Sequence, residues 1–142
     1  MIRYYSSHDE PICSVEEQQE IIEWTKKNFK SFKNNGFNRY NFLLNGCDNV
    51  PNCVWDIKNK IIIKENLQNY KQEPLFKDTL GYMFDGSQLH AHIDPNVNNL
   101  IHTRFNVYIK IPEEGGYPVY NGKVFRLKER TYLCCRAGIE PH

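Results

Sequence analysis

The chain has 142 residues, of which 40% are hydrophobic and 25% charged, a composition typical of one folded globular domain. Its formal net charge of +1, with no long basic run, argues against a nucleic-acid-binding protein. Neither a signal-peptide core nor an apolar run long enough to cross a bilayer is present, so we expect a cytoplasmic protein without a membrane partner.

The front of the chain, residues 1–74, is predicted to be helical and mixed. Ser14 and Glu17 have the spacing of a capping box, which predicts a helix over residues 15–32. Residues 39–44 are then typical of a strand. A second helix is expected from about residue 56 towards Tyr70, although its β-branched isoleucines are poor helix formers.

The back of the chain, residues 75–142, is dominated by predicted strands. Residues 79–84, 103–111 and 131–135 fit strands, and Asn121-Gly122 is typical of a tight hairpin turn. We therefore expect a single α+β domain, a double-stranded β-helix (jelly roll) backed by N-terminal helices.

Histidine and aspartate residues form a candidate metal-binding motif. His92 and Asp94 are two residues apart, so their side chains fall on one face of an extended segment, and His142 follows 142 − 92 = 50 residues after His92. Two imidazoles and one carboxylate are the facial triad that holds Fe(II) and leaves the opposite positions open. His90 is a rival ligand, and His102 is a candidate surface or supporting group.

The predicted strand at residues 103–111 has one polar face. Arg104, Asn106, Tyr108 and Lys110 alternate with apolar residues. If that face points inward, Arg104 offers a bidentate fork for a carboxylate, and if it points outward the strand is simply half exposed.

Residues from about Gly81 to His142 resemble the catalytic core of the 2-oxoglutarate/Fe(II)-dependent dioxygenases. Gly86 stands six residues before His92, as the family's glycine turn does, and residues 103–115 are most similar to the aspartyl/asparaginyl β-hydroxylase group. Gly116, the hairpin and Leu133 before His142 are similar to prolyl 4-hydroxylases.

The resemblance implies an enzyme that hydroxylates a peptide or protein side chain (Asp, Asn or Pro). Its cofactors would be Fe(II) on His92, Asp94 and His142, with 2-oxoglutarate as cosubstrate and ascorbate as a candidate accessory reductant. Arg104, Asn106 and Met83 match positions that line the cosubstrate pocket. The family has an Arg or Lys after the distal histidine for the far carboxylate; this sequence ends at His142, so either a longer form supplies that base or Lys110 does.

Two alternatives stay open. The first is a jelly-roll binding module without catalytic activity. The second is a structural zinc protein that uses four of the five cysteines, namely Cys47, Cys53, Cys134 and Cys135. The spacing argues against zinc, because adjacent Cys134 and Cys135 would point to opposite faces of a strand. The odd cysteine count, without framework spacing, instead favours reduced thiols.

Overall fold

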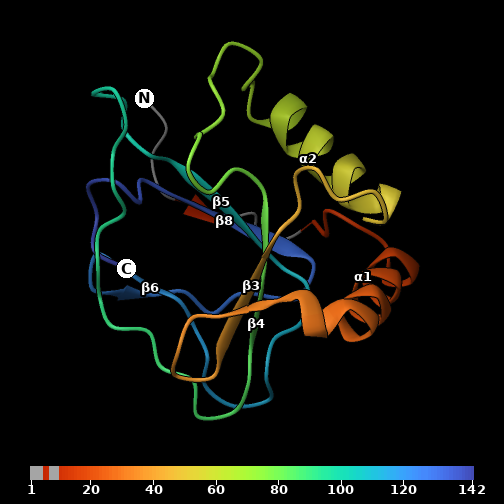
Figure 1. Cartoon of the computed structure of the whole chain (residues 1–142). Coiled ribbons are helices and arrows are strands. Elements are labelled where there is room, and N and C mark those ends of the chain that lie inside the picture. The colour runs from red at the N-terminus through yellow and green to blue at the C-terminus, as the bar shows by residue number, and fades with distance from the viewer. Residues whose placement is uncertain (1–4, 7–9) are drawn as a thin grey trace. The chain divides into compact units, whose positions relative to one another are not determined.

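Helices and small antiparallel sheets make up the computed structural model, which describes residues 5–6 and 10–142 (Figure 1). The prediction of a mixed α+β structure is confirmed, and the described strands form no closed barrel. Two compact units are present: residues 19–90, and residues up to 18 together with 91–142. No described helix is long and apolar enough to cross a membrane.

Helix α1 (Val15–Asn28) begins at the predicted capping box. The Glu17 amide donates to Ser14 Oγ at 3.0 Å, and the Ser14 amide donates to Glu17 Oε1 at 2.9 Å. These two bonds satisfy backbone donors that the helix itself leaves unpaired. The last predicted turn is a tighter 3-10 helix, η1 (Phe29–Ser31), so the α-helix ends four residues before the expected Phe32.

In the unit of residues 19–90, three strands form one antiparallel sheet. The order is β2-β3-β4, with bounds Lys33–Asn34, Arg39–Leu43 and Thr79–Met83, close to the two strands predicted here. Tyr40 pairs with Tyr82 across β3 and β4, and the Phe29 ring packs on both of them. An aromatic core thus joins the end of α1 to the sheet.

Helix α2 (Asn52–Lys64) begins and ends earlier than predicted. Pro51 precedes its first residue, and proline suits this position because the first helical amides have no partner within the helix. At the other end Asn66 has a left-handed φ of 54°, its amide donates to Ile63, and the Leu67 amide donates to Ile62. This is a Schellman termination, and it stops the helix before Tyr70.

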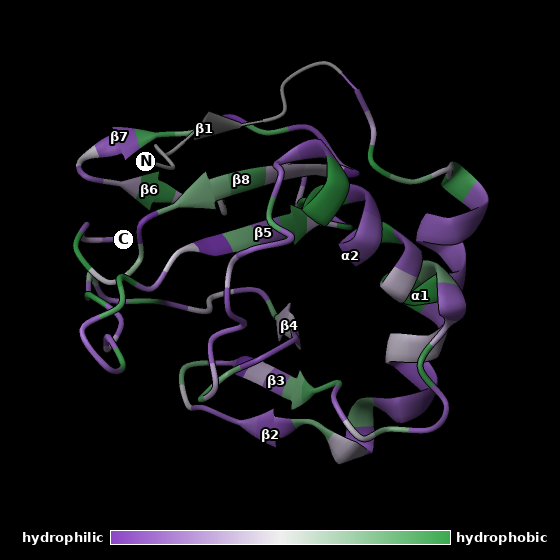
Figure 2. Cartoon of the chain, turned by 90° about the horizontal axis from the view of Figure 1, so that it is seen from above, coloured by the Kyte–Doolittle hydropathy of each residue, from purple (hydrophilic) through white to green (hydrophobic). Residues whose placement is uncertain are grey.

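The other unit contains a sheet of β1 (Tyr5–Ser6), β8 (Thr131–Cys135) and β5 (Arg104–Tyr108), in that order. Every residue of the central strand β8 is buried, and its apolar stretch is visible in Figure 2. Arg104 pairs with Cys135 in the antiparallel register of β5 and β8. Strand β5 stops at Tyr108, short of the predicted Ile111, because side chains replace the strand partners: Ile109 O accepts from Gln18, and the Ile111 amide donates to Glu129.

The predicted hairpin is present in the same unit. Strands β6 (Val119–Tyr120) and β7 (Lys123–Val124) are joined by Asn121 and Gly122, whose φ angles are 49° and 76°. Two successive positive φ angles are what a type I′ turn requires, and Asn-Gly is the pair that adopts them at low cost. The side chain of Tyr120 lies in the apolar core, with Phe125 and Leu133 in the same cluster.

Candidate metal centre

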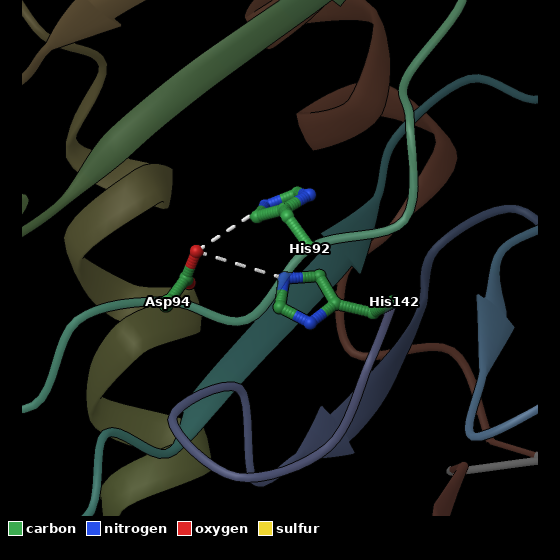
Figure 3. A group of neighbouring side chains, drawn as sticks. All are labelled: His92, Asp94 and His142. Carbon is green, nitrogen blue, oxygen red and sulfur yellow. Dashed lines mark ion pairs between the residues drawn. The ribbon is translucent and has the colours of Figure 1, made fainter.

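His92, Asp94 and His142 meet in the unit of residues 91–142. Asp94 Oδ1 lies 3.3 Å from His92 Nε2 and 3.7 Å from His142 Nε2 (Figure 3). One donor atom from each residue lies within 4.8 Å of the others. Ligands bound at about 2.1 Å to one ion at right angles stand about 3 Å apart, so small rotations would bring all three onto one metal.

The segment that carries His92 and Asp94 is not part of a regular strand. It still makes strand-like bonds: the amides of His92 and His142 each donate to the other residue's carbonyl at 3.0 Å, and the Asp94 amide donates to Ala137 O at 2.8 Å. Pro95 follows and has no N–H with which to continue the pairing. The expected common face of His92 and Asp94 is nevertheless present.

The contacts and burial of the His142 side chain suit a metal ligand. Its Nδ1 lies 3.0 Å from the Glu140 carbonyl, a pairing in which Nδ1 carries the proton and Nε2 keeps its lone pair. Its side chain is only 3% exposed, and Nε2 is buried without a hydrogen-bond partner in the described structure. Burial lowers the pKa of His142 below its ordinary value, which favours the neutral, metal-binding imidazole.

The two oxygens of Asp94 face different groups. Oδ1 faces the two histidine ligands, whereas Oδ2 forms an ion pair with Arg104 and lies 3.5 Å from His102 Nδ1. The Asp94 side chain is 7% exposed, so an unpaired charge here would be costly. One carboxylate oxygen is thus left facing the two histidines, and the other pairs with Arg104.

The predicted cosubstrate residues lie in different surroundings. Arg104 contacts Asp94, and Asn106 Nδ2 donates to the Tyr120 hydroxyl at 2.7 Å. Lys110 is exposed beyond the end of β5, and the pKa of Glu129 is lowered first by the hydrogen bond from the Ile111 amide and less by the charge of Lys110. Met83 is on β4 of the other unit and is 55% exposed.

The contribution of Tyr120 to this group was not predicted from the sequence, and the position of His102 was predicted only in general terms. The ring of Tyr120 stacks on His142, with centroids 5.3 Å apart and planes 17° apart. His102, predicted as a surface or supporting group, is buried beside Asp94. His90, the rival ligand, is outside the group and packs its ring against Phe37. The Asn-Gly turn was the sequence signal for the hairpin, but nothing local indicated that Tyr120 would reach His142.

Comparisons with protein-family models, curated proteins and solved structures found no match. The site therefore has to be interpreted from its own donors. The His92, Asp94 and His142 group is the one set of three potential metal ligands in the described part of the chain, and it contains no cysteine. Its two nitrogens and one oxygen suit a mid-series divalent ion.

Proposed function

We propose that this chain is a non-haem Fe(II)/2-oxoglutarate-dependent dioxygenase that hydroxylates an Asp, Asn or Pro side chain of a peptide or protein. The observation that carries the proposal is the convergence of two imidazole nitrogens and one carboxylate oxygen from His92, Asp94 and His142. When bound there, Fe(II) with 2-oxoglutarate and O2 supplies oxidative hydroxylation of a C–H bond, with succinate and CO2 as coproducts.

The protein residues fix the donors and leave one side accessible. The side chains of Asp94 and His142 are buried, whereas the His92 side chain is 38% exposed. The exposed side of the group is therefore the side where His92 lies, and we assign substrate and cosubstrate entry to it. We further propose that the fold is a jelly roll.

Arg104 is proposed to bind the cosubstrate in addition to its observed contact with Asp94. A guanidinium has five N–H donors in a rigid fork, and the ion pair with Asp94 Oδ2 occupies only part of them. We assign the remaining donors to a carboxylate of 2-oxoglutarate. The Arg104 guanidinium would then bind the Asp94 carboxylate and a carboxylate of the cosubstrate at the same time.

The test is an anaerobic titration with Fe(II) and then 2-oxoglutarate, followed by a succinate assay in air with ascorbate. A 2-oxo acid that chelates Fe(II) gives a visible charge-transfer absorbance, so binding is seen without knowing the peptide substrate. Asp94→Ala should abolish Fe(II) binding, the absorbance and succinate formation, because it removes the anionic ligand. Asp85→Ala, which removes an exposed aspartate of the other unit, is the matched control and should behave as the wild type.

Two outcomes would contradict the proposal in different ways. If Asp94→Ala binds one equivalent of Fe(II) with unchanged affinity, the ligand assignment is wrong. If the wild type binds Fe(II) but neither absorbance nor succinate appears, the inactive binding module is the better description. Zinc that is lost on substitution of cysteines but not of His92 would support the structural zinc protein.

A further inference from the structure

The β6–β7 hairpin contacts the segment that carries the distal ligand. The Asn121 amide donates to Pro141 O at 2.8 Å, next to His142 in the chain. The Tyr120 ring, 3% exposed, lies almost parallel to the His142 ring. The hairpin therefore restrains the ligand segment at its backbone and at its imidazole.

Tyr120 is itself held firmly from strand β5. Its hydroxyl accepts from Asn106 Nδ2 at 2.7 Å and is hydrogen-bonded to Tyr108. Burial raises the pKa of Tyr120, and burial raises that of Tyr108 to about 12, so both rings carry neutral phenols at physiological pH. A buried ring with fixed hydroxyl partners is a rigid surface against which another ring can be oriented.

We infer that Tyr120 is a positioning residue for the metal centre. The bond between His142 Nδ1 and Glu140 O restrains the imidazole at one edge, and the stacked Tyr120 ring restrains the tilt of its plane. Together they direct Nε2 towards Asp94 Oδ1, 3.7 Å away. This inference rests on the metal site of the proposed function but not on Fe(II) or on 2-oxoglutarate. The alternative is that Tyr120 only fills space in the hydrophobic core.

The test compares three variants by titration with Co(II), whose visible spectrum reports the coordination geometry. Tyr120→Leu removes the stacked ring, Tyr120→Phe keeps the ring without the hydroxyl, and Phe125→Leu is the control. Phe125 belongs to the same core cluster, 6.2 Å from Tyr120 between ring centroids, and its loss creates a comparable defect. Groups that orient a ligand typically change metal affinity by about 10- to 100-fold when lost.

We expect Tyr120→Leu to weaken Co(II) binding at least about tenfold and to alter the spectrum, whereas Tyr120→Phe and Phe125→Leu stay within about threefold of the wild type. Equal losses in Tyr120→Leu and Phe125→Leu would show a general core effect and overturn the inference. An unchanged affinity in Tyr120→Leu would overturn it as well. If Co(II) binds but no succinate forms with Fe(II), 2-oxoglutarate and O2, the proposed function fails while this comparison still decides the role of Tyr120.

A second readout does not depend on metal. A stacked phenol shifts the ring-proton resonances of His142 upfield, and His142→Gln identifies those resonances by their disappearance. Tyr120→Leu should return them to ordinary positions, and Tyr120→Phe should preserve the shift. Resonances that do not move in Tyr120→Leu would mean that the rings are not stacked in solution, and the inference would be wrong.

Discussion

Replacement of Arg104 by alanine tests the charge arrangement around Asp94. Hydrogen bonds to charged groups contribute about 1.5–3 kcal/mol, and the Arg104 side chain is 32% exposed, so screening reduces the expected loss to about 1–2 kcal/mol. For a chain of this size that corresponds to a fall of roughly 3–8 °C in Tm. The fall arises because the buried Asp94 carboxylate loses its cation.

A divalent ion should reduce the fall in Tm that Arg104→Ala causes. An ion on Asp94 supplies positive charge that partly replaces the guanidinium, so saturating Mn(II) should raise the Tm of Arg104→Ala more than that of the wild type. The assay is thermal unfolding followed by circular dichroism, with and without Mn(II). Arg126→Ala is the control, because Arg126 is exposed over the Tyr117 ring and its loss should cost under about 0.5 kcal/mol.

Two results would refute this reasoning. Equal melting of Arg104→Ala and the wild type without Mn(II) would show that the pair with Asp94 contributes nothing to stability. An equal rise in Tm on adding Mn(II) would show that the ion and Arg104 do not share Asp94. If the variant also binds 2-oxoglutarate about one to two decades more weakly, the second, cosubstrate role of Arg104 is supported.

Three further predictions concern the fold. Leu133→Ala should lower the free energy of unfolding by about 2–5 kcal/mol in urea titrations, because the fully buried residue leaves a cavity; no change would mean that β8 is not central to the core. Ser14→Ala should cost about 0.5–2 kcal/mol through the lost cap, and Ser31→Ala, at the end of η1, should cost less. Burial raises the pKa of Asp78, but hydrogen bonds from Lys58 and two side-chain amides outweigh it, and the net pKa is lowered. The stability that Asp78 contributes is thus fully present above its unfolded pKa and is lost as the pH falls through its lower folded pKa, so wild type and Asp78→Asn should differ in urea midpoint at neutral pH and converge in strong acid.

Local patterns in the sequence predicted much of the secondary structure. The capping box at Ser14 and the Asn121-Gly122 turn depend on neighbouring residues only, so their structures follow from short-range chemistry. The limits of α2 were harder, because its termination depends on a left-handed Asn66, a conformation that asparagine tolerates but does not dictate.

The candidate site, too, could be predicted from the sequence only in part. The candidate ligands could be predicted from their chemistry, since two histidines and one aspartate form a donor set that suits a divalent metal ion. The partner of Arg104 could not, because an alternating strand shows that a polar face exists but not which buried carboxylate it meets. The contribution of Tyr120 depends on the hairpin folding back over a segment about 20 residues later in the chain, which no local pattern reveals.

The reciprocal bonds between His92 and His142 have a topological consequence. Strands β5, β6, β7 and β8 all lie between these two residues, so the two candidate ligands close this stretch of chain into a loop. The two ends of residues 91–142 consequently stand beside each other, and the two histidines meet only when the whole loop between them closes. The candidate donor set is therefore assembled by the fold of the whole segment and does not exist in the unfolded chain.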